Sequence, residues 1–326
     1  MKKLIETIQN IFKIEELRNR LLTTFLFVVI YRLGSYIVLP GVNVQVLQEL
    51  GSSANSGLMM LLDMFSGGAF SNASVFALGI MPYITASIVV QLLGMAIPYF
   101  QKLQREGESG RRKMDQITRY LTVLLLLFQG PAYLLSLKYQ VGPALPEGNF
   151  FMITSTLILA AGSMFVLWLG ERITEKGIGN GVSFIILVGI IARFPRSLMG
   201  EFMSRLNEST GGLVMFLAEI VFLLLVIAAS ILLVQGTRKV PVQYAKRIVG
   251  NQQYGGVRQY IPLKVNAAGV MPIIFAQALM LIPTSLSGFF ATDGNVSNFA
   301  LAFMDVNGFW YNFVFFILII AFTYFY

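Results

Sequence analysis

The stretch LVMFLAEIVFLLLVIAASILLV, residues 213–234, carries one charged side chain, Glu219, in 22 positions. A helix needs about 20 residues to cross a hydrocarbon core of about 30 Å, so this stretch predicts a transmembrane helix. Lipid offers no partner for main-chain N–H and C=O groups, which excludes an open strand at that depth. Comparable apolar stretches recur along the chain, and the sequence therefore predicts an all-α polytopic membrane protein.

The composition supports this class. Apolar residues make up 56% of the 326 residues and charged residues only 12%, whereas a soluble domain has roughly a quarter charged residues. The chain contains neither cysteine nor histidine, which excludes disulfides, thiol chemistry and most transition-metal sites. We expect no enzymatic activity, no metal site and no cofactor.

Hydropathy predicts eight spans, of which the fifth is short for a full crossing. Residues 58–70 are too few to span, and Gly67 and Gly68 interrupt them, so we expect a half-inserted helix covered by protein or water. The predicted spans are residues 21–39, 75–97, 117–137, 151–169, 182–194, 213–234, 265–282 and 309–326.

The distribution of basic residues predicts the orientation. Residues 1–20, 98–119, 170–181 and 236–264 hold 19 of the 24 Lys and Arg. By the positive-inside rule these segments and the N-terminus are cytoplasmic. The arginines between the fifth and sixth spans are the weakest point of this assignment.

Two basic regions leave alternatives open. In residues 1–20 the apolar side chains lie near helical spacing, typical of an amphipathic helix on the membrane surface, although a frayed basic tail also fits. Residues 236–264 form a long basic loop with interleaved tyrosines. Such a loop can bind nucleic acid phosphates or acidic protein surfaces, or it can serve only to set the topology. We expect no specific DNA partner.

Few ionisable residues fall within or near the spans. Arg32, Asp63 and Glu219 are functional candidates because burying a charge in a membrane is costly. The alternative is that each reaches the interface or pairs with a neighbour. An ion-coupled transporter would usually show several acids at mid-depth, a pattern that this sequence lacks.

Several polar strings carry a more specific signal. They are FALGIMPYITAS (76–87), EGESGRRK (106–113), WLGERITEKGIGNG (168–181), YAKR (244–247) and PLKVNAAGVMPIIFA (262–276). In order and spacing they resemble the SecY family, the pore-forming subunits of the protein-conducting channel in bacterial membranes. The resemblance runs from the first span to the last residue.

The resemblance implies ten spans in two inverted halves of five. The N-terminal half would be residues 21–200, and residues 201–326 would begin the C-terminal half after the cytoplasmic segment 1–20. The chain ends inside the expected eighth span, so about two and a half spans would lie beyond this sequence. An apolar ring that closes the pore by excluding water is also implied. Its members here would be Ile80, Ile84, Val182, Ile186 and Ile274.

The half-inserted helix, residues 58–72, corresponds to the plug of this family, which would seal the pore and move aside when a chain enters. Its candidate residues are Leu61, Asp63, Phe65, Gly67 and Gly68. Thr85, Gln129 and Asn266 match polar positions of the lateral gate, through which apolar segments would pass into the lipid bilayer.

The resemblance also implies partners. SecE and SecG would be companion subunits in a bacterial plasma membrane, and signal peptides and nascent chains would be the substrates. The ribosome and the SecA motor would dock on basic cytoplasmic residues, namely Arg111, Arg112, Lys246, Arg247 and Arg258. Related sequences often have a basic pair where this chain has Asn251 and Gln252, which puts that contact in doubt. A solute or ion transporter and a membrane scaffold remain the alternatives.

Overall fold

The chain forms two compact units in the computed structural model, and each is described by itself. One unit is Met1–Pro195 with Phe275–Ile317, and the other is Arg196–Ile274 with Leu318–Tyr326. The structure describes residues 13–43, 63, 66–141, 146, 148–207, 212–243, 247–249, 252–254, 258–269, 271–277, 279–280 and 308–325. Residues 1–12 of the predicted amphipathic helix, Leu61, Phe65 and Lys246 lie outside them, whereas residues 15–20 form the start of the first described helix.

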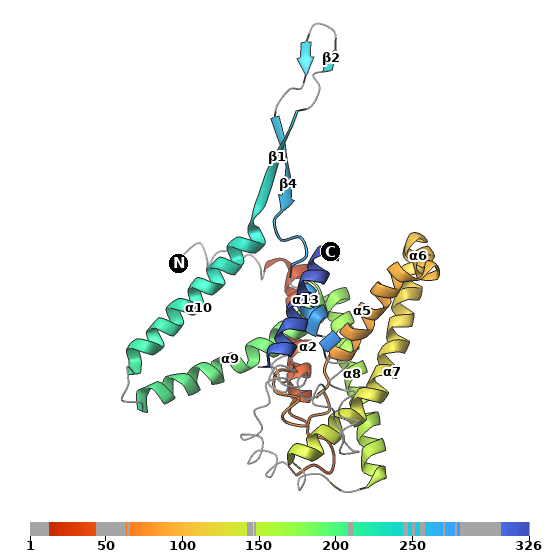
Figure 1. Cartoon of the computed structure of the whole chain (residues 1–326), viewed down its shortest axis with the longest axis vertical. Coiled ribbons are helices and arrows are strands. Elements are labelled where there is room, and N and C mark those ends of the chain that lie inside the picture. The colour runs from red at the N-terminus through yellow and green to blue at the C-terminus, as the bar shows by residue number, and fades with distance from the viewer. Residues whose placement is uncertain are drawn as a thin grey trace. The chain divides into compact units, whose positions relative to one another are not determined.

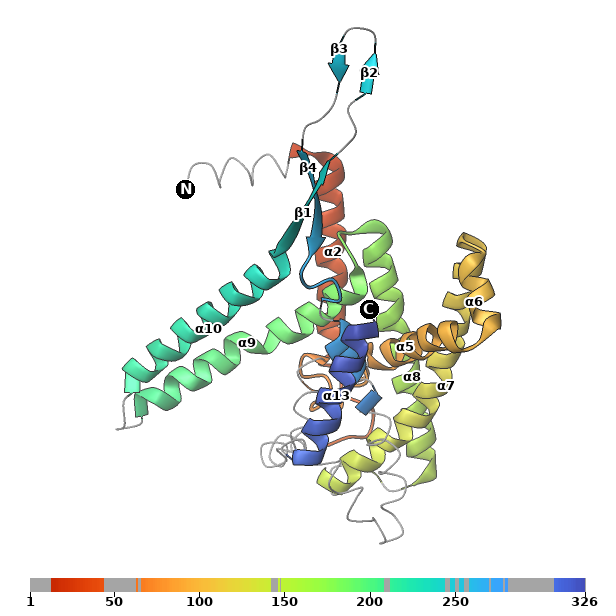
Figure 2. The ribbon, with the colours of Figure 1, turned by 45° about the horizontal axis from the view of Figure 1, so that its top comes forward.

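Most predicted spans contain a helix (Figures 1 and 2). The helices are α2 (Glu15–Gly34), α5 (Met81–Ala96), α6 (Pro98–Arg105), α7 (Glu108–Val141), α8 (Asn149–Lys176), α9 (Gly181–Asn207), α10 (Gly212–Gln235) and α13 (Phe309–Phe325). Within the described residues, α7 to α10 provide four helices long and apolar enough to cross a membrane. A fifth span results if the bent pair α5 and α6 is counted as one.

The helix boundaries correct several predictions. The fifth span is not short, because α9 has 27 residues. The second span was predicted from residue 75, but α5 begins only at Met81, where Pro82 occupies the first turn. Gly79, just before it, has φ +52°, a conformation that favours glycine. After Ile97 the chain bends by 99° into α6.

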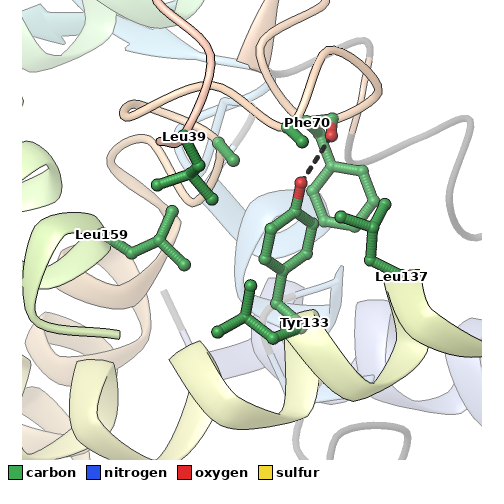
Figure 3. Packing of buried hydrophobic residues seen from close by; sticks show 8 residues of the cluster. Leu39, Phe70, Tyr133, Leu137 and Leu159 are labelled. Carbon is green, nitrogen blue, oxygen red and sulfur yellow. Dashed lines mark hydrogen bonds between the residues drawn. The ribbon is translucent and has the colours of Figure 1, made fainter. Parts of the chain in front are cut away.

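The core of the first unit lies where residues 67–80, a series of turns, meet two helices. α7 packs against α5 and α8, and α2 packs against α8. Phe70 meets the ring of Tyr133 edge to face, with centroids 4.7 Å apart. The buried cluster comprises Leu39, Phe70, Ala73, Ala77, Tyr133, Leu134, Leu137 and Leu159 (Figure 3).

In the second unit, the basic loop predicted at residues 236–264 contains a β-ribbon. Strand β1 (Thr237–Gln243) pairs antiparallel with β4 (Arg258–Lys264), and β2 (Arg247–Val249) pairs with β3 (Gln252–Tyr254). Pro241 and Pro262 fit this ribbon because each strand of a pair has one edge that needs no N–H donor. The all-α prediction missed this element.

An ion-pair cluster joins α10 to the end of α9 in the same unit. Arg205 lies 2.7 Å from the Glu219 carboxylate and 2.9 Å from that of Glu201. Phe202 and Phe216 pack edge to face beside them, at 5.3 Å between ring centroids. Glu219, the one charge in α10, is therefore paired, as one of the two sequence interpretations held.

Candidate functional site

The described part of the predicted plug, Asp63 with residues 66–72, is a short helical turn that reverses at two glycines. Gly67 has φ +65° and Gly68 has φ +95°, values that other residues rarely adopt. The Gly68 N–H donates to the Asp63 carbonyl at 2.9 Å. The Ser71 N–H donates to the Asp63 carboxylate at 2.8 Å, which closes the turn. We call Asp63 and residues 66–72 the plug segment.

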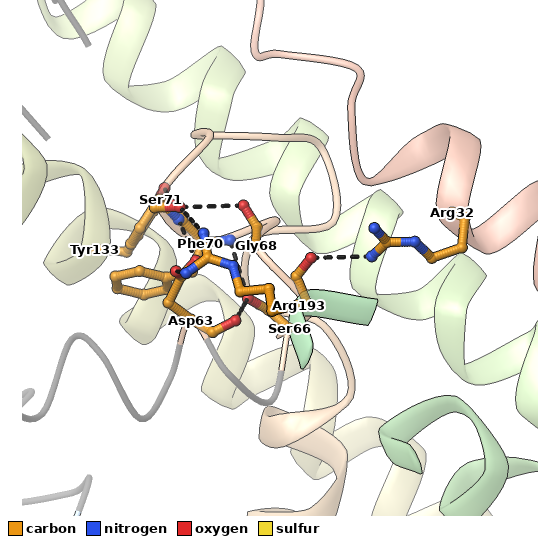
Figure 4. Close-up of polar contacts among 9 residues, drawn as sticks. Arg32, Asp63, Ser66, Gly68, Phe70, Ser71, Tyr133 and Arg193 are labelled. Atoms are coloured by element: carbon orange, nitrogen blue, oxygen red, sulfur yellow. Dashed lines mark hydrogen bonds and ion pairs between the residues drawn. The ribbon is translucent and has the colours of Figure 1, made fainter. Parts of the chain in front are cut away.

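Asp63 is buried and carries the strongest polar contact of the plug segment. Its side chain is only 7% exposed, and its carboxylate forms an ion pair with Arg193 of α9 (Figure 4). The same guanidinium donates to the Ser71 hydroxyl at 2.8 Å. Arg193 thus binds both ends of the turn, and we call this set of contacts the Arg193 bridge.

Three further contacts reach main-chain carbonyls of the plug segment. Arg32 of α2 donates to the Gly67 carbonyl at 2.9 Å. The Tyr31 hydroxyl donates to Ser66 at 3.3 Å, and the Tyr133 hydroxyl of α7 donates to Phe70 at 2.8 Å. Helices α2, α7 and α9 therefore hold one short segment from different sides, within a single compact unit.

The plug segment approaches α9 closely enough to exclude any side chain. A Cβ on Gly67 would lie 2.9 Å from the Cα of Gly189 and 2.8 Å from the Arg32 guanidinium. Gly189 is one helical turn beyond Ile186, a predicted ring residue. The plug segment is therefore seated on the helix that carries Val182 and Ile186.

The predicted ring residues fall into three places. Ile80 and Ile84 are buried and one turn apart at the start of α5, where the Ile84 N–H donates to the Ile80 carbonyl at 3.1 Å. Val182 and Ile186 are half-buried, one turn apart in α9. Ile274 belongs to the second unit. The assignment of these five residues to a ring stays a prediction.

Each predicted gate residue has a side chain that is hydrogen-bonded or half-buried. Thr85 is buried in α5 and donates to the Met81 carbonyl at 3.1 Å. Gln129 is half-buried on α7, the helix against which α5 packs. Asn266 lies in the second unit, where its side-chain oxygen accepts the Gly269 N–H at 3.0 Å. Their role in a gate is untested by these contacts.

The predicted docking residues are partly described. Arg111 and Arg112 are exposed at the start of α7, and Arg112 pairs with Glu108 at 2.8 Å. Among the described residues, Arg111 makes no ion pair. Arg247 and Arg258 fall in β2 and β4 respectively. The described residues contain no group of three acids that could hold a metal ion.

Four residues of this site were not predicted from the sequence, namely Tyr31, Tyr133, Gly189 and Arg193. Arg193 carried a signal, because it is an exception to the positive-inside distribution and such an exception needs a local partner. Tyr31, Tyr133 and Gly189 gave none, since their contacts join residues 35, 63 and 122 positions apart in the chain.

Comparisons with known proteins agree with this description. The family model described as SecY matches residues 74–326. The protein translocase subunit SecY of Halalkalibacterium halodurans is 41% identical over 331 residues, covering 99% of this chain and 76% of that protein.

Solved channels share the fold at low sequence identity. The structure of a protein conducting channel aligns with a TM-score of 0.57 and 18% identity, covering 83% of this chain and 59% of that one. Canine Sec61 in a ribosome–channel complex from the endoplasmic reticulum aligns with a TM-score of 0.56 and 17% identity, covering 83% and 60%. The chain thus spans about six tenths of each solved channel.

These matches confirm the family resemblance and the predicted helical channel fold. They leave the solute transporter alternative without support. The family model covers most of the chain and the bacterial relative aligns over nearly all of it, so the chain belongs to the SecY family.

Proposed function

We propose that this chain is the pore-forming subunit of a channel that moves secretory polypeptides across a membrane and releases apolar segments sideways into lipid. The observation that carries the proposal is the plug segment. It is a short turn, seated on α9 at Gly189 and held by polar contacts from three helices. Its apolar contacts with the core run through the buried Ala69 and Phe70, and its other described contacts are polar, so a displacement would open a small region while the helices remain folded.

The chemistry of the proposed pathway is that of an apolar constriction. The constriction would be lined by Ile80 and Ile84 at the start of α5 and by Val182 and Ile186 of α9. These side chains would close around a translocating polypeptide and would exclude water when no polypeptide is present. Ile274 is the fifth residue that the family resemblance assigns to this constriction. A segment of sufficient apolar area would then partition into lipid, at about 25 cal/mol per Å² buried. No covalent step is required of the protein.

The partners follow from the family and from the exposed basic residues. We propose SecE and SecG as companion subunits in a bacterial plasma membrane, with the N-terminus cytoplasmic. The ribosome and a SecA-type motor would dock on Arg111, Arg112 and the β-ribbon. A ribosome is present in the complex that contains the canine relative, which supports that part of the proposal.

Photo-crosslinking tests the proposed function directly. A ribosome is stalled on a secretory nascent chain that carries a photo-reactive side chain, in vesicles containing this protein. We expect crosslinks to peptides containing Ile84 and Ile274. A cytosolic nascent chain of equal length is the control and should give no crosslink.

The outcome separates a channel from a scaffold. If no position of the secretory chain crosslinks near Ile84 or Ile274, the channel proposal is wrong. A scaffold would also be indifferent to fixing the plug segment in place. A disulfide between a cysteine at Phe65 and one on a neighbouring ring helix should stop transport by a channel and leave a scaffold working.

A further inference from the structure

Arg193 differs from the other residues that hold the plug segment, because its contacts recognise the folded turn. Its guanidinium pairs with the Asp63 carboxylate and also donates to the Ser71 hydroxyl at 2.8 Å. These two partners are eight positions apart in sequence and meet only because the turn is closed. If the turn opens, both contacts are lost together.

Gly68 leaves room for the Arg193 guanidinium against the backbone of the turn. A Cβ on Gly68 would lie 3.1 Å from Nε and 3.2 Å from Nη2 of Arg193, so the guanidinium lies directly against the glycine. The planar fork of arginine can satisfy two acceptors at fixed spacing, whereas a lysine ammonium is a point charge on a flexible stem. The site therefore fits arginine specifically.

Separating Asp63 from Arg193 raises the free energy of the open state. Asp63 is 7% exposed while Arg193 is 43% exposed, so the carboxylate depends on the pair more than the guanidinium does. Moving the plug segment breaks a charge-assisted contact and leaves the two charges to be solvated separately. In contrast, Arg32 donates a single hydrogen bond to a carbonyl of the segment.

We propose that Arg193 is the positioning residue that sets how readily the channel opens, and thereby which polypeptides it accepts. This inference rests on the proposed channel function. A substrate must supply enough binding free energy, through its apolar segment, to offset the loss of the Arg193 bridge. Weakening the bridge lowers that threshold, so the channel leaks ions at rest and accepts substrates with poorer apolar segments.

The test uses the full-length protein with its partner subunits, reconstituted in vesicles. Two quantities are measured, namely the resting ion flux and the transport of two secretory substrates, one intact and one with a charge inserted in its apolar segment. For Arg193→Gln we expect the resting flux to rise about tenfold, as loss of one charge-assisted hydrogen bond implies. The ratio of weakened to intact substrate transported should rise with it.

Four further variants make the result specific. Asp63→Asn should match Arg193→Gln, and the double variant should add little because both changes break the same contact. Arg193→Lys keeps the charge but not the fork, so we expect an intermediate flux. Arg196→Gln removes the same charge from the same helix, where the described residues offer it no ion-pair partner, and should behave as wild type.

The possible failures are distinguishable. If the wild-type protein transports neither substrate, the proposed channel function is wrong. If the wild type transports substrate but Arg193→Gln and Asp63→Asn have the same resting ion flux and the same substrate ratio as the wild type, the proposed role of Arg193 is wrong. Should Arg193→Gln fail to assemble, Asp63→Asn decides the matter alone, because it lies in the segment that moves.

Discussion

At the scale of single residues, glycines determine how closely backbone segments approach in the first unit. Gly162 of α8 faces the main-chain carbonyl of Val75, and a Cβ on that glycine would overlap the carbonyl oxygen. Relief would require a backbone shift in α8 or in residues 66–80, because no flexible side-chain end is involved. A methyl group at position 162 would therefore displace the backbone of the segment that leads into α5.

Replacing Gly162 with alanine should destabilise the protein by about 1–3 kcal/mol, the usual cost of overpacking. The measurement is thermal unfolding of the purified complex, followed by the loss of its monodisperse peak. Gly200→Ala in α9 is the matched control, since a Cβ there meets nothing within 4 Å. That control should stabilise by about 0.5–1 kcal/mol through helix propensity. Equal melting temperatures for the two variants would contradict the packing described.

A second residue-level prediction concerns the Tyr133 hydroxyl. Tyr133→Phe keeps the ring against Phe70 but removes the 2.8 Å hydrogen bond to its carbonyl. The loss is about 0.5–1.5 kcal/mol, because that carbonyl still accepts the Ala73 N–H. Hydrogen exchange in residues 66–74 should accelerate about 3- to 10-fold. Tyr120→Phe changes an exposed tyrosine of the same helix and should leave exchange in this segment unchanged.

At the scale of elements, α9 and α10 are held together by charges in an otherwise apolar setting. No side chain of α10 is buried within the described part of the chain. Its one acid therefore depends on Arg205 for a partner. An unpaired carboxylate facing lipid would be costly, whereas an apolar side chain in its place would not.

The pair can be tested by removing one partner and then both. Arg205→Leu should reduce membrane insertion of residues 181–235 several-fold, since an unpaired acid in a span costs up to about 2.5–3.5 kcal/mol, the value at the helix centre, and Glu219 lies closer to one end. Arg205→Leu with Glu219→Leu should insert at least as well as wild type. A glycosylation acceptor placed between α9 and α10 reports insertion. A double variant as poor as the single one would show that the charges matter for another reason.

At the scale of the whole molecule, the exceptions to the charge distribution become understandable. In the predicted topology Arg193 and Arg205 lie on the side where basic residues are otherwise scarce, and both are paired with acids. Pairing lowers the cost of holding an arginine near the membrane, but it does not change the count of basic residues on which the orientation is predicted. The prediction still rests on the 19 Lys and Arg of the other segments, and we expect the β-ribbon on the cytoplasmic side.

The orientation is testable because the chain has no cysteine of its own. Single cysteines replacing Arg238 in β1 and Pro146 before α8 should label on opposite sides of the membrane. A membrane-impermeant maleimide should reach the cysteine at 146 in intact cells, and the cysteine at 238 only in inverted vesicles. Labelling of both in intact cells would invert or break the predicted topology.

The sequence was sufficient for the helical class, the approximate positions of most spans and the family, because those depend on local apolar length and on contiguous strings. It was insufficient where contacts between residues far apart in the chain determine the local structure. Residues 75–80 are apolar enough to predict a helix, yet they are non-helical. The neighbouring plug segment has its carbonyls hydrogen-bonded by the side chains of residues 31, 32 and 133. The β-ribbon was not predicted because Val240 and Val242 of β1 are separated by Pro241, and a proline inside a short run argues against a strand unless the strand is at an edge.

Most contacts that hold the plug segment end on main-chain carbonyls, at Ser66, Gly67 and Phe70. A carbonyl is the same in every residue, so these contacts place almost no demand on side-chain identity. Side-chain identity matters at the glycine pair, at Asp63 and Ser71, and at Ser66 and Phe70, whose hydroxyl and ring make contacts of their own. A foreign plug sequence grafted between the same helices should therefore seat if it keeps those six residues, because the described hydrogen bonds from the surrounding helices otherwise end on its main chain.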